Sequence, residues 1–130
     1  MKETWQTFFE TFMLPQEPAR RVIAELRVGF LDHRWVLPQK DLQPNLEGAI
    51  ALTDQRLMVG WIDGRSRQVL HLRRLDFLTE RLWQKSEAEL PYQAVLGSNL
   101  TAAVVLQTAA ATELESTMLS DLLNEAFTRI

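Results

Sequence analysis

The sequence contains no cysteine. This absence excludes a disulfide scaffold, a thiol nucleophile and a thiolate metal site, and it fits a reducing compartment. Only two histidines are present, His33 and His71, and neither has a neighbour at metal-ligand spacing. A glycine-rich phosphate loop and a nucleophile elbow are missing too. We therefore expect a protein that is not an enzyme and that uses neither a cofactor nor a metal.

Long apolar runs are also missing. A membrane-spanning helix needs about 20 mostly apolar residues, and the longest weakly polar stretch, residues 101–111, is interrupted by Gln107 and Thr108. The first residues carry an acid at Glu3 and lack a continuous apolar core, so we expect no signal peptide. The sequence predicts a cytoplasmic protein, with attachment to the periphery of a membrane as the alternative.

An excess of positive charge is absent as well. The formal net charge is −3, whereas general nucleic-acid binding usually needs a basic surface, so we expect no nucleic-acid partner. The charge is uneven, because residues 15–75 hold ten of the fourteen basic side chains and residues 76–130 hold three. This imbalance is either ordinary scatter or a basic face that meets an acidic partner.

The chain does contain enough apolar residues for one domain. It has 130 residues, 46% of them apolar, which suits a single core. Alternation from Gly48, a turn at 53–55 and a second run over 56–62 predict a β-hairpin. Asp63-Gly64 is a tight-turn signal, so residues 67–72 are the expected returning strand.

Further strands are expected on both sides of this hairpin. Residues 20–31 alternate between apolar and polar side chains, as a strand with one buried face does. Residues 77–83, 92–96 and 101–108 predict a second group of strands. A helix within 76–90 is the alternative, because leucines recur there at helical spacing.

Amphipathic helices are predicted at both ends of the chain. Apolar side chains recur at helical spacing from Leu114 to Ile130, behind a capping box formed by Thr112 and Glu115. Residues 2–13 also predict a helix, and its aromatic face either packs on the domain, contacts a partner or lies in a membrane interface. This aromatic face consists of Trp5, Phe8, Phe9 and Phe12.

The hairpin contains a local motif, a glycine with alternating residues and then Leu52-Thr53-Asp54-Gln55-Arg56-Leu57. With about seven strands and a C-terminal helix, it resembles the bacterial pleckstrin-homology-like domains and the related GRAM domains, over most of residues 19–129. The resemblance implies a mainly β (α+β) fold, a barrel of about seven antiparallel strands in two near-orthogonal sheets, capped by the C-terminal helix. Residues 1–14 are then an N-terminal amphipathic helix, and residues 19–130 are the pleckstrin-homology-like domain.

Two residues of this motif have predicted structural roles. Asp54 is expected to accept a hydrogen bond from the backbone two residues further on, closing an Asx-turn. Arg56 is expected to pair with Asp54 or with a carboxylate from a loop.

The resemblance implies a binding or scaffolding module that acts through protein–protein interaction or self-association. A protein partner would add an extended segment in a groove between an edge strand and the final helix. A homo-oligomer would instead form through an interaction surface made by Trp5, Phe8, Phe9 and Phe12.

Two other hypotheses remain open. In the first, cations of the inter-strand loops 31–47 and 63–67 bind an anionic lipid headgroup through charge-assisted hydrogen bonds. In the second, the chain is a small acidic secretion-type chaperone, which requires a central helix within 76–90. The headgroup-binding cations are Arg34, Lys40, Arg65 and Arg67.

Overall fold

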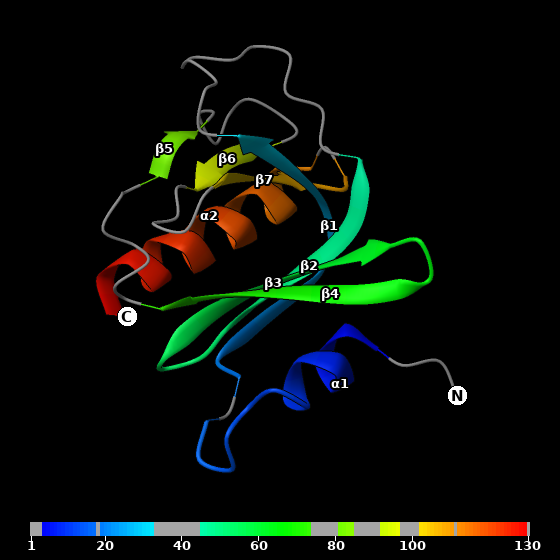
Figure 1. Cartoon of the computed structure of the whole chain (residues 1–130). Coiled ribbons are helices and arrows are strands. Elements are labelled where there is room, and N and C mark those ends of the chain that lie inside the picture. Colours follow the sequence, from blue (N-terminus) through cyan, green and yellow to red (C-terminus); the bar gives the residue numbers. More distant parts are fainter. Residues whose placement is uncertain are drawn as a thin grey trace.

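The computed structural model describes residues 4–17, 19–32, 45–73, 81–84, 92–96, 102–110 and 112–129. These residues are mainly β-structure, with a short helix near the N-terminus and a long one near the C-terminus (Figure 1). In chain order the elements are α1 (Trp5–Glu10), β1 (Arg21–Asp32), β2 (Leu46–Leu52), β3 (Arg56–Asp63), β4 (Ser66–Arg73), β5 (Arg81–Gln84), β6 (Gln93–Leu96), β7 (Ala102–Thr108) and α2 (Glu113–Arg129).

The seven strands form one antiparallel sheet in the order β4-β3-β2-β1-β7-β6-β5. β1 is central and has 12 residues. It pairs with β2 from Arg21 to Val28 and with β7 from Leu26 to Asp32. This long strand therefore joins the β2–β4 half of the sheet to the β5–β7 half.

The expected barrel is not what the described strands form. β4 and β5 lie at opposite ends of the strand order, and no ladder between described residues joins them. A barrel needs pairing around its whole circumference. Here α2 lies between the two halves of the sheet (Figure 1), and its leucines cover the enclosed apolar face instead. The predictions of a mainly β fold and a C-terminal helix are confirmed, and the prediction of a closed barrel is wrong.

Residues 81–84 decide between the two predictions made for residues 76–90. They form β5, which pairs with β6, so for these four residues the strand is confirmed and the helix is wrong. The rest of 76–90 lies outside the described residues.

The main core lies between α2 and one face of the sheet. Leu119, Leu122 and Leu123 of α2 are fully buried there. They join inward-facing side chains from six strands, because alternate residues of each strand point to the same face. These are Leu26, Val28, Ile50, Leu52, Leu57, Val59, Leu72, Ala94, Leu96, Val104 and Leu106.

α1 covers the other face of the β1–β4 region (Figure 1). Phe9 is fully buried against Ala49, Ala51 and Met58. Burial of such a ring contributes about 1.5–3 kcal/mol. Because α1 and α2 cover opposite faces, β2 is buried on both sides, which explains its nearly unbroken apolar sequence.

Each helix begins at a capping threonine. Thr4 accepts a hydrogen bond from the Thr7 amide at 3.1 Å, and Thr112 accepts one from the Glu115 amide at 3.3 Å. The Glu115 carboxylate accepts from the Ala110 amide at 3.0 Å. The capping box is thus confirmed for the threonine hydroxyl. The Glu115 carboxylate, however, accepts from the Ala110 amide and not from the expected Thr112 amide.

Candidate functional site

β1 contains a β-bulge between its two paired regions. Ile23 pairs with Ile50, and the next pair is Leu26 with Gly48. β1 therefore uses one residue more than β2 over this interval, which bends the strand and interrupts its ladder. The bulged segment is Ala24-Glu25, and it forms the centre of the candidate site.

One edge of β1 is unpaired beside this bulge. The ladder with β7 begins at Leu26, which pairs with Thr108. Residues 21–23 therefore pair with β2 alone, Ala24 and Glu25 form the bulge, and no described strand pairs with the second edge of residues 21–25. An edge of this kind presents backbone N–H and C=O groups that another extended segment can pair with.

α2 runs alongside the unpaired edge. Glu125 of α2 lies 2.9 Å from the Arg21 guanidinium and 3.4 Å from that of Arg20. Arg20 also pairs with Asp54 at 2.6 Å, and these two acidic partners raise the pKa of Arg20, Asp54 more than Glu125. The contacts fix the C-terminal half of α2 against the start of β1.

A groove remains between β1 and the N-terminal half of α2. Its volume is about 260 Å³. Its walls are mostly apolar, and Met118 at its edge is 44% exposed. We call it the β1–α2 groove, and it is lined by Val22, Ile23, Ala24, Glu25, Leu26, Thr108, Glu115 and Met118.

A second hollow, of about 300 Å³, adjoins the same bulge. It shares Ala24, Glu25 and Leu26 with the groove, and Trp5 of α1 contributes to it. The bulged segment of β1 thus borders two hollows.

Thr108 lines the groove and carries a buried hydroxyl. Its side chain is 1% exposed, and its Oγ1 has no hydrogen-bond partner among the described residues. A buried hydroxyl without a partner costs about 1–3 kcal/mol. This oxygen has almost no accessible surface, so a ligand in the groove does not reach it.

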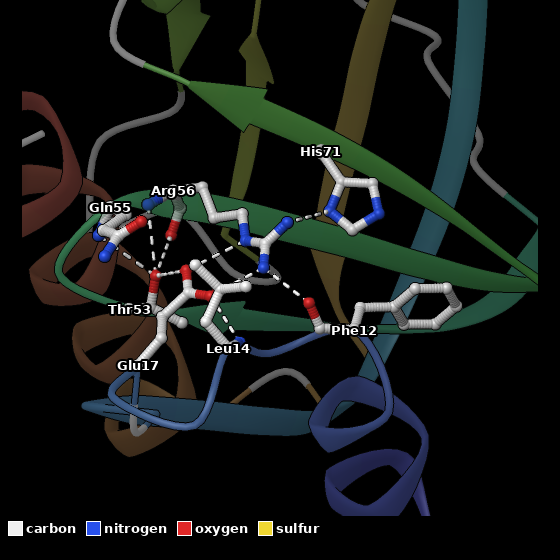
Figure 2. Close-up of polar contacts among 7 residues, drawn as sticks. All are labelled: Phe12, Leu14, Glu17, Thr53, Gln55, Arg56 and His71. Atoms are coloured by element: carbon white, nitrogen blue, oxygen red, sulfur yellow. Dashed lines mark hydrogen bonds and ion pairs between the residues drawn. The ribbon is translucent and has the colours of Figure 1, made fainter.

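A buried ion pair holds the segment after α1 against the sheet (Figure 2). The Glu17 side chain is fully buried, and its two carboxylate oxygens accept from Arg56 at 2.6 and 2.9 Å. Arg56 also donates to the Phe12 carbonyl at 2.5 Å and lies 3.3 Å from His71 Nδ1. The guanidinium thereby joins the N-terminal segment to β3 and β4.

Glu17 remains charged in spite of its burial. Burial alone raises the pKa of Glu17, but hydrogen bonds from Arg56, Thr53 and the Leu14 amide together lower it below 4.5. A carboxylate with this many donors is a structural anchor, and every bond in Figure 2 is internal to the chain. We therefore do not treat this ion pair as a binding site.

The turn between β2 and β3 differs from the prediction in one residue. The Thr53 hydroxyl accepts hydrogen bonds from the Gln55 and Arg56 amides at 3.1 Å each. The side chain that closes the turn is thus Thr53, while Asp54 binds Arg20. The expectation that Arg56 pairs with a carboxylate is confirmed, and that carboxylate is Glu17.

Of the four proposed headgroup-binding cations, two are described. Arg65 is exposed in the turn between β3 and β4. Arg67 lies in β4, where its guanidinium stacks 4.7 Å from the Trp5 ring centroid and donates to the Thr4 carbonyl at 3.3 Å. Arg67 is therefore already engaged by α1. Arg34 and Lys40, and also His33, lie outside the described residues.

The aromatic face of α1 is mostly turned toward the sheet. Phe9 is fully buried, and Trp5 and Phe8 are half-buried. Phe12 is 38% exposed and contacts the His71 ring edge-on at 5.4 Å. Of the four residues predicted as an interaction surface, Phe12 has the largest exposed fraction.

Comparison of the chain with protein-family models, with curated proteins and with solved structures gave no match. In the described part of the chain, no three His, Cys, Asp or Glu side chains group as metal ligands do. No described helix has the length and apolar character needed to cross a membrane.

Proposed function

We propose that this chain is a non-enzymatic binding module that holds an extended segment of a partner protein in the β1–α2 groove. The observation that carries this proposal is the unpaired edge of β1 at residues 21–25, which lies next to an open apolar groove. Addition of a strand to such an edge uses backbone hydrogen bonds for affinity and side-chain pockets for selectivity.

The size of the groove supports a peptide over a small molecule. Small-molecule sites usually enclose about 300–1,000 Å³, and this groove has about 260 Å³. That space suits one or two side chains of an extended segment. Catalysis is not part of the proposal, because the residues that line the groove include no histidine, cysteine, serine or lysine.

A pleckstrin-homology-like origin belongs to the same proposal. The strand order, the long shared β1 and the C-terminal helix support it, and the open sheet counts against it. In that view the protein is a bacterial cytoplasmic scaffold. Self-association through Phe12 and attachment to anionic lipid through Arg65 are alternatives with fewer supporting contacts. The chaperone hypothesis loses its required helix at residues 81–84.

The experiment that tests the proposal fills the groove. Ala24 is exposed in β1 and lines both hollows, so an Ala24→Trp side chain occupies the space that a ligand would use. Gln68→Trp is the matched control, because Gln68 is an exposed strand residue of β4 that does not line the groove.

The probe is a library of random 12-residue peptides, selected on the immobilised chain and then measured one by one by fluorescence anisotropy. We expect selected peptides to bind the wild type and Gln68→Trp with equal affinity and to lose binding to Ala24→Trp. Equal binding to both variants, or no enrichment of any peptide, would refute the proposal.

A further inference from the structure

His71 lies where the segment that follows α1 meets the sheet (Figure 2). It belongs to β4 and is opposite Met58 of β3 in the strand register, and Met58 is part of the apolar cluster beneath α1. The Nδ1 atom of His71 is 3.3 Å from a terminal nitrogen of the Arg56 guanidinium. The His71 ring also contacts the Phe12 ring edge-on at 5.4 Å. His71 therefore touches both the arginine that holds this segment and an aromatic side chain of the segment itself.

The contact with Arg56 identifies the form of His71 that fits the docked segment. A guanidinium carries five N–H donors and no acceptor, so the ring nitrogen that faces it must be an acceptor. A neutral imidazole has one such nitrogen, whereas an imidazolium has none, because both of its nitrogens carry protons. The arrangement in the structure thus corresponds to a neutral His71 with its proton on Nε2.

The same guanidinium fastens the N-terminal segment to the sheet. Its other nitrogens donate to the Glu17 carboxylate at 2.6 and 2.9 Å and to the Phe12 carbonyl at 2.5 Å. Protonation of His71 replaces its hydrogen bond to Arg56 with a contact between two cations. The Arg56 side chain is only 13% exposed, and like charges repel more strongly there than in bulk water. A guanidinium that moves away from the ring also loses its alignment with the Phe12 carbonyl.

The charged groups around His71 give this effect its direction. β3 contributes Arg56, and the segment after α1 contributes Glu17, with the guanidinium between the Glu17 carboxylate and the ring (Figure 2). Along β4, Arg73 follows two residues later and pairs with Arg56 in the strand register. Burial raises the pKa of Glu17, but hydrogen bonds bring it below 4.5. Glu17 therefore stays charged over the range of about pH 5 to 8 in which histidine changes its charge.

α1 is short enough to depend on contacts of this kind. It has six residues, and a helix of that length is not stable by itself in water. Beneath it lie Ala49, Ala51 and Met58, all fully buried. An undocked α1 uncovers this apolar part of the sheet together with the Phe9 ring.

We infer that His71 is a pH-sensitive switch for α1: neutral His71 helps Arg56 to hold the segment after α1, and protonation of His71 shifts α1 toward an undocked state. This inference does not depend on peptide binding in the β1–α2 groove. Loss of one hydrogen bond to a charged group changes an equilibrium constant by about tenfold or more. We therefore expect undocking of α1 to become about tenfold more frequent between about pH 7.5 and pH 5.5.

Hydrogen exchange of backbone amides measures this undocking in the full chain. The Phe8 amide donates to the Thr4 carbonyl at 2.9 Å, and the Phe12 amide donates to the Phe9 carbonyl at 3.0 Å. Both amides are protected only while the segment is folded. Their protection factors, corrected for the intrinsic pH dependence of exchange, give the opening equilibrium. Core amides of α2 at residues 119–123 are the internal reference.

Three variants separate the switch from a general effect of acid. His71→Asn keeps a neutral acceptor for Arg56, so the protection of α1 should be equal at both pH values. His71→Leu removes the acceptor, so α1 should open more often, and to the same extent at both pH values. His33→Asn is the matched control, because His33 is the other histidine of the chain, and it should retain the wild-type pH dependence. Circular dichroism checks that each variant folds.

The protonation of His71 is followed in the same samples. The NMR signals of its ring are identified by their absence from His71→Asn, and their pH titration should coincide with the loss of α1 protection.

The inference is supported if Phe8 and Phe12 lose about tenfold in protection at the lower pH, if the α2 core does not, and if His71→Asn abolishes the loss. Equal protection of α1 at both pH values overturns it. So does a pH dependence that persists in His71→Asn, one that disappears in His33→Asn, or one that the α2 core shares equally. A His71 ring that does not change its charge in this range overturns it as well.

Discussion

Replacement of Phe9 by alanine tests whether α1 is part of the folded core. The Phe9 ring is fully buried against Ala49, Ala51 and Met58, and a buried Phe→Ala change costs about 3–5 kcal/mol. Such a loss is a large fraction of the 5–15 kcal/mol by which a typical domain is stable. With a urea m-value of about 2 kcal/mol/M, the unfolding midpoint falls by roughly 1.5–2.5 M.

Phe12→Ala is the matched control from the turn that follows α1. Phe12 is 38% exposed, and its ring contacts Phe8 and His71 edge-on. Loss of these contacts costs about 1 kcal/mol, which lowers the urea midpoint by roughly 0.5 M. Urea unfolding followed by tryptophan fluorescence measures both variants. If Phe9→Ala costs no more than Phe12→Ala, α1 does not pack on its own sheet, and the aromatic face is free for a partner.

Three further predictions concern the same side of the sheet. Gly60→Ala places a Cβ 2.6 Å from Trp5 Cζ3, so we expect the free energy of unfolding, measured with denaturant, to fall by about 1–3 kcal/mol. This loss should be smaller when Trp5 is also replaced by alanine, and an equal loss in that background would show that the Trp5 ring is not the obstacle. Because hydrogen bonds hold the pKa of Glu17 below 4.5, its stabilising contribution is present above that pH and is lost as the pH falls through the folded pKa. Glu17→Gln should therefore make the free energy of unfolding less dependent on pH in the acid range. An equally steep dependence in the variant would contradict a charged, stabilising Glu17. Arg56→Lys keeps the positive charge but removes the guanidinium group that donates to Glu17 and to the Phe12 carbonyl. We therefore expect the free energy of unfolding to fall by about 1.5–3 kcal/mol. A thermal melt like that of the wild type would show that the charge alone is sufficient.

Local sequence patterns predicted most of the strands and both helices. Alternation placed β1, and the turn signals at residues 53–55 and at Asp63-Gly64 placed β2, β3 and β4, because these features act over a few neighbouring residues. The closed barrel was wrong because closure depends on contacts between β4 and β5, which are consecutive in the chain but lie at opposite ends of the sheet. No local pattern reports on such a contact.

The candidate site was predicted only as a general type, a groove between an edge strand and the final helix. The sequence did not single out Glu17, Thr108 or Glu115 as groove or anchor residues. Glu17 precedes a proline and looks like an ordinary solvated acid, and its burial depends on Arg56, 39 residues further on. The bulge in β1 was missed because residues 20–31 alternate almost regularly, and only the register against β2 shows the extra residue.

The charge pattern shows the same limit of sequence reasoning. The basic residues of the first half suggested either ordinary scatter or a basic face that meets an acidic partner. In the structure, however, Arg20, Arg21, Arg56 and Arg67 are engaged by carboxylates, carbonyls and aromatic rings of the chain itself.

The most direct test of the proposed binding function is an NMR titration of the ¹⁵N-labelled chain with a 12-residue peptide selected on the immobilised chain. Our account predicts amide shift changes concentrated at residues 22–26, at Thr108 and at residues 115–118. It also predicts slower hydrogen exchange at the newly paired amides of residues 21–25. Shift changes centred on Arg65 and Phe12, or none at saturating peptide, would contradict the β1–α2 groove as the binding site.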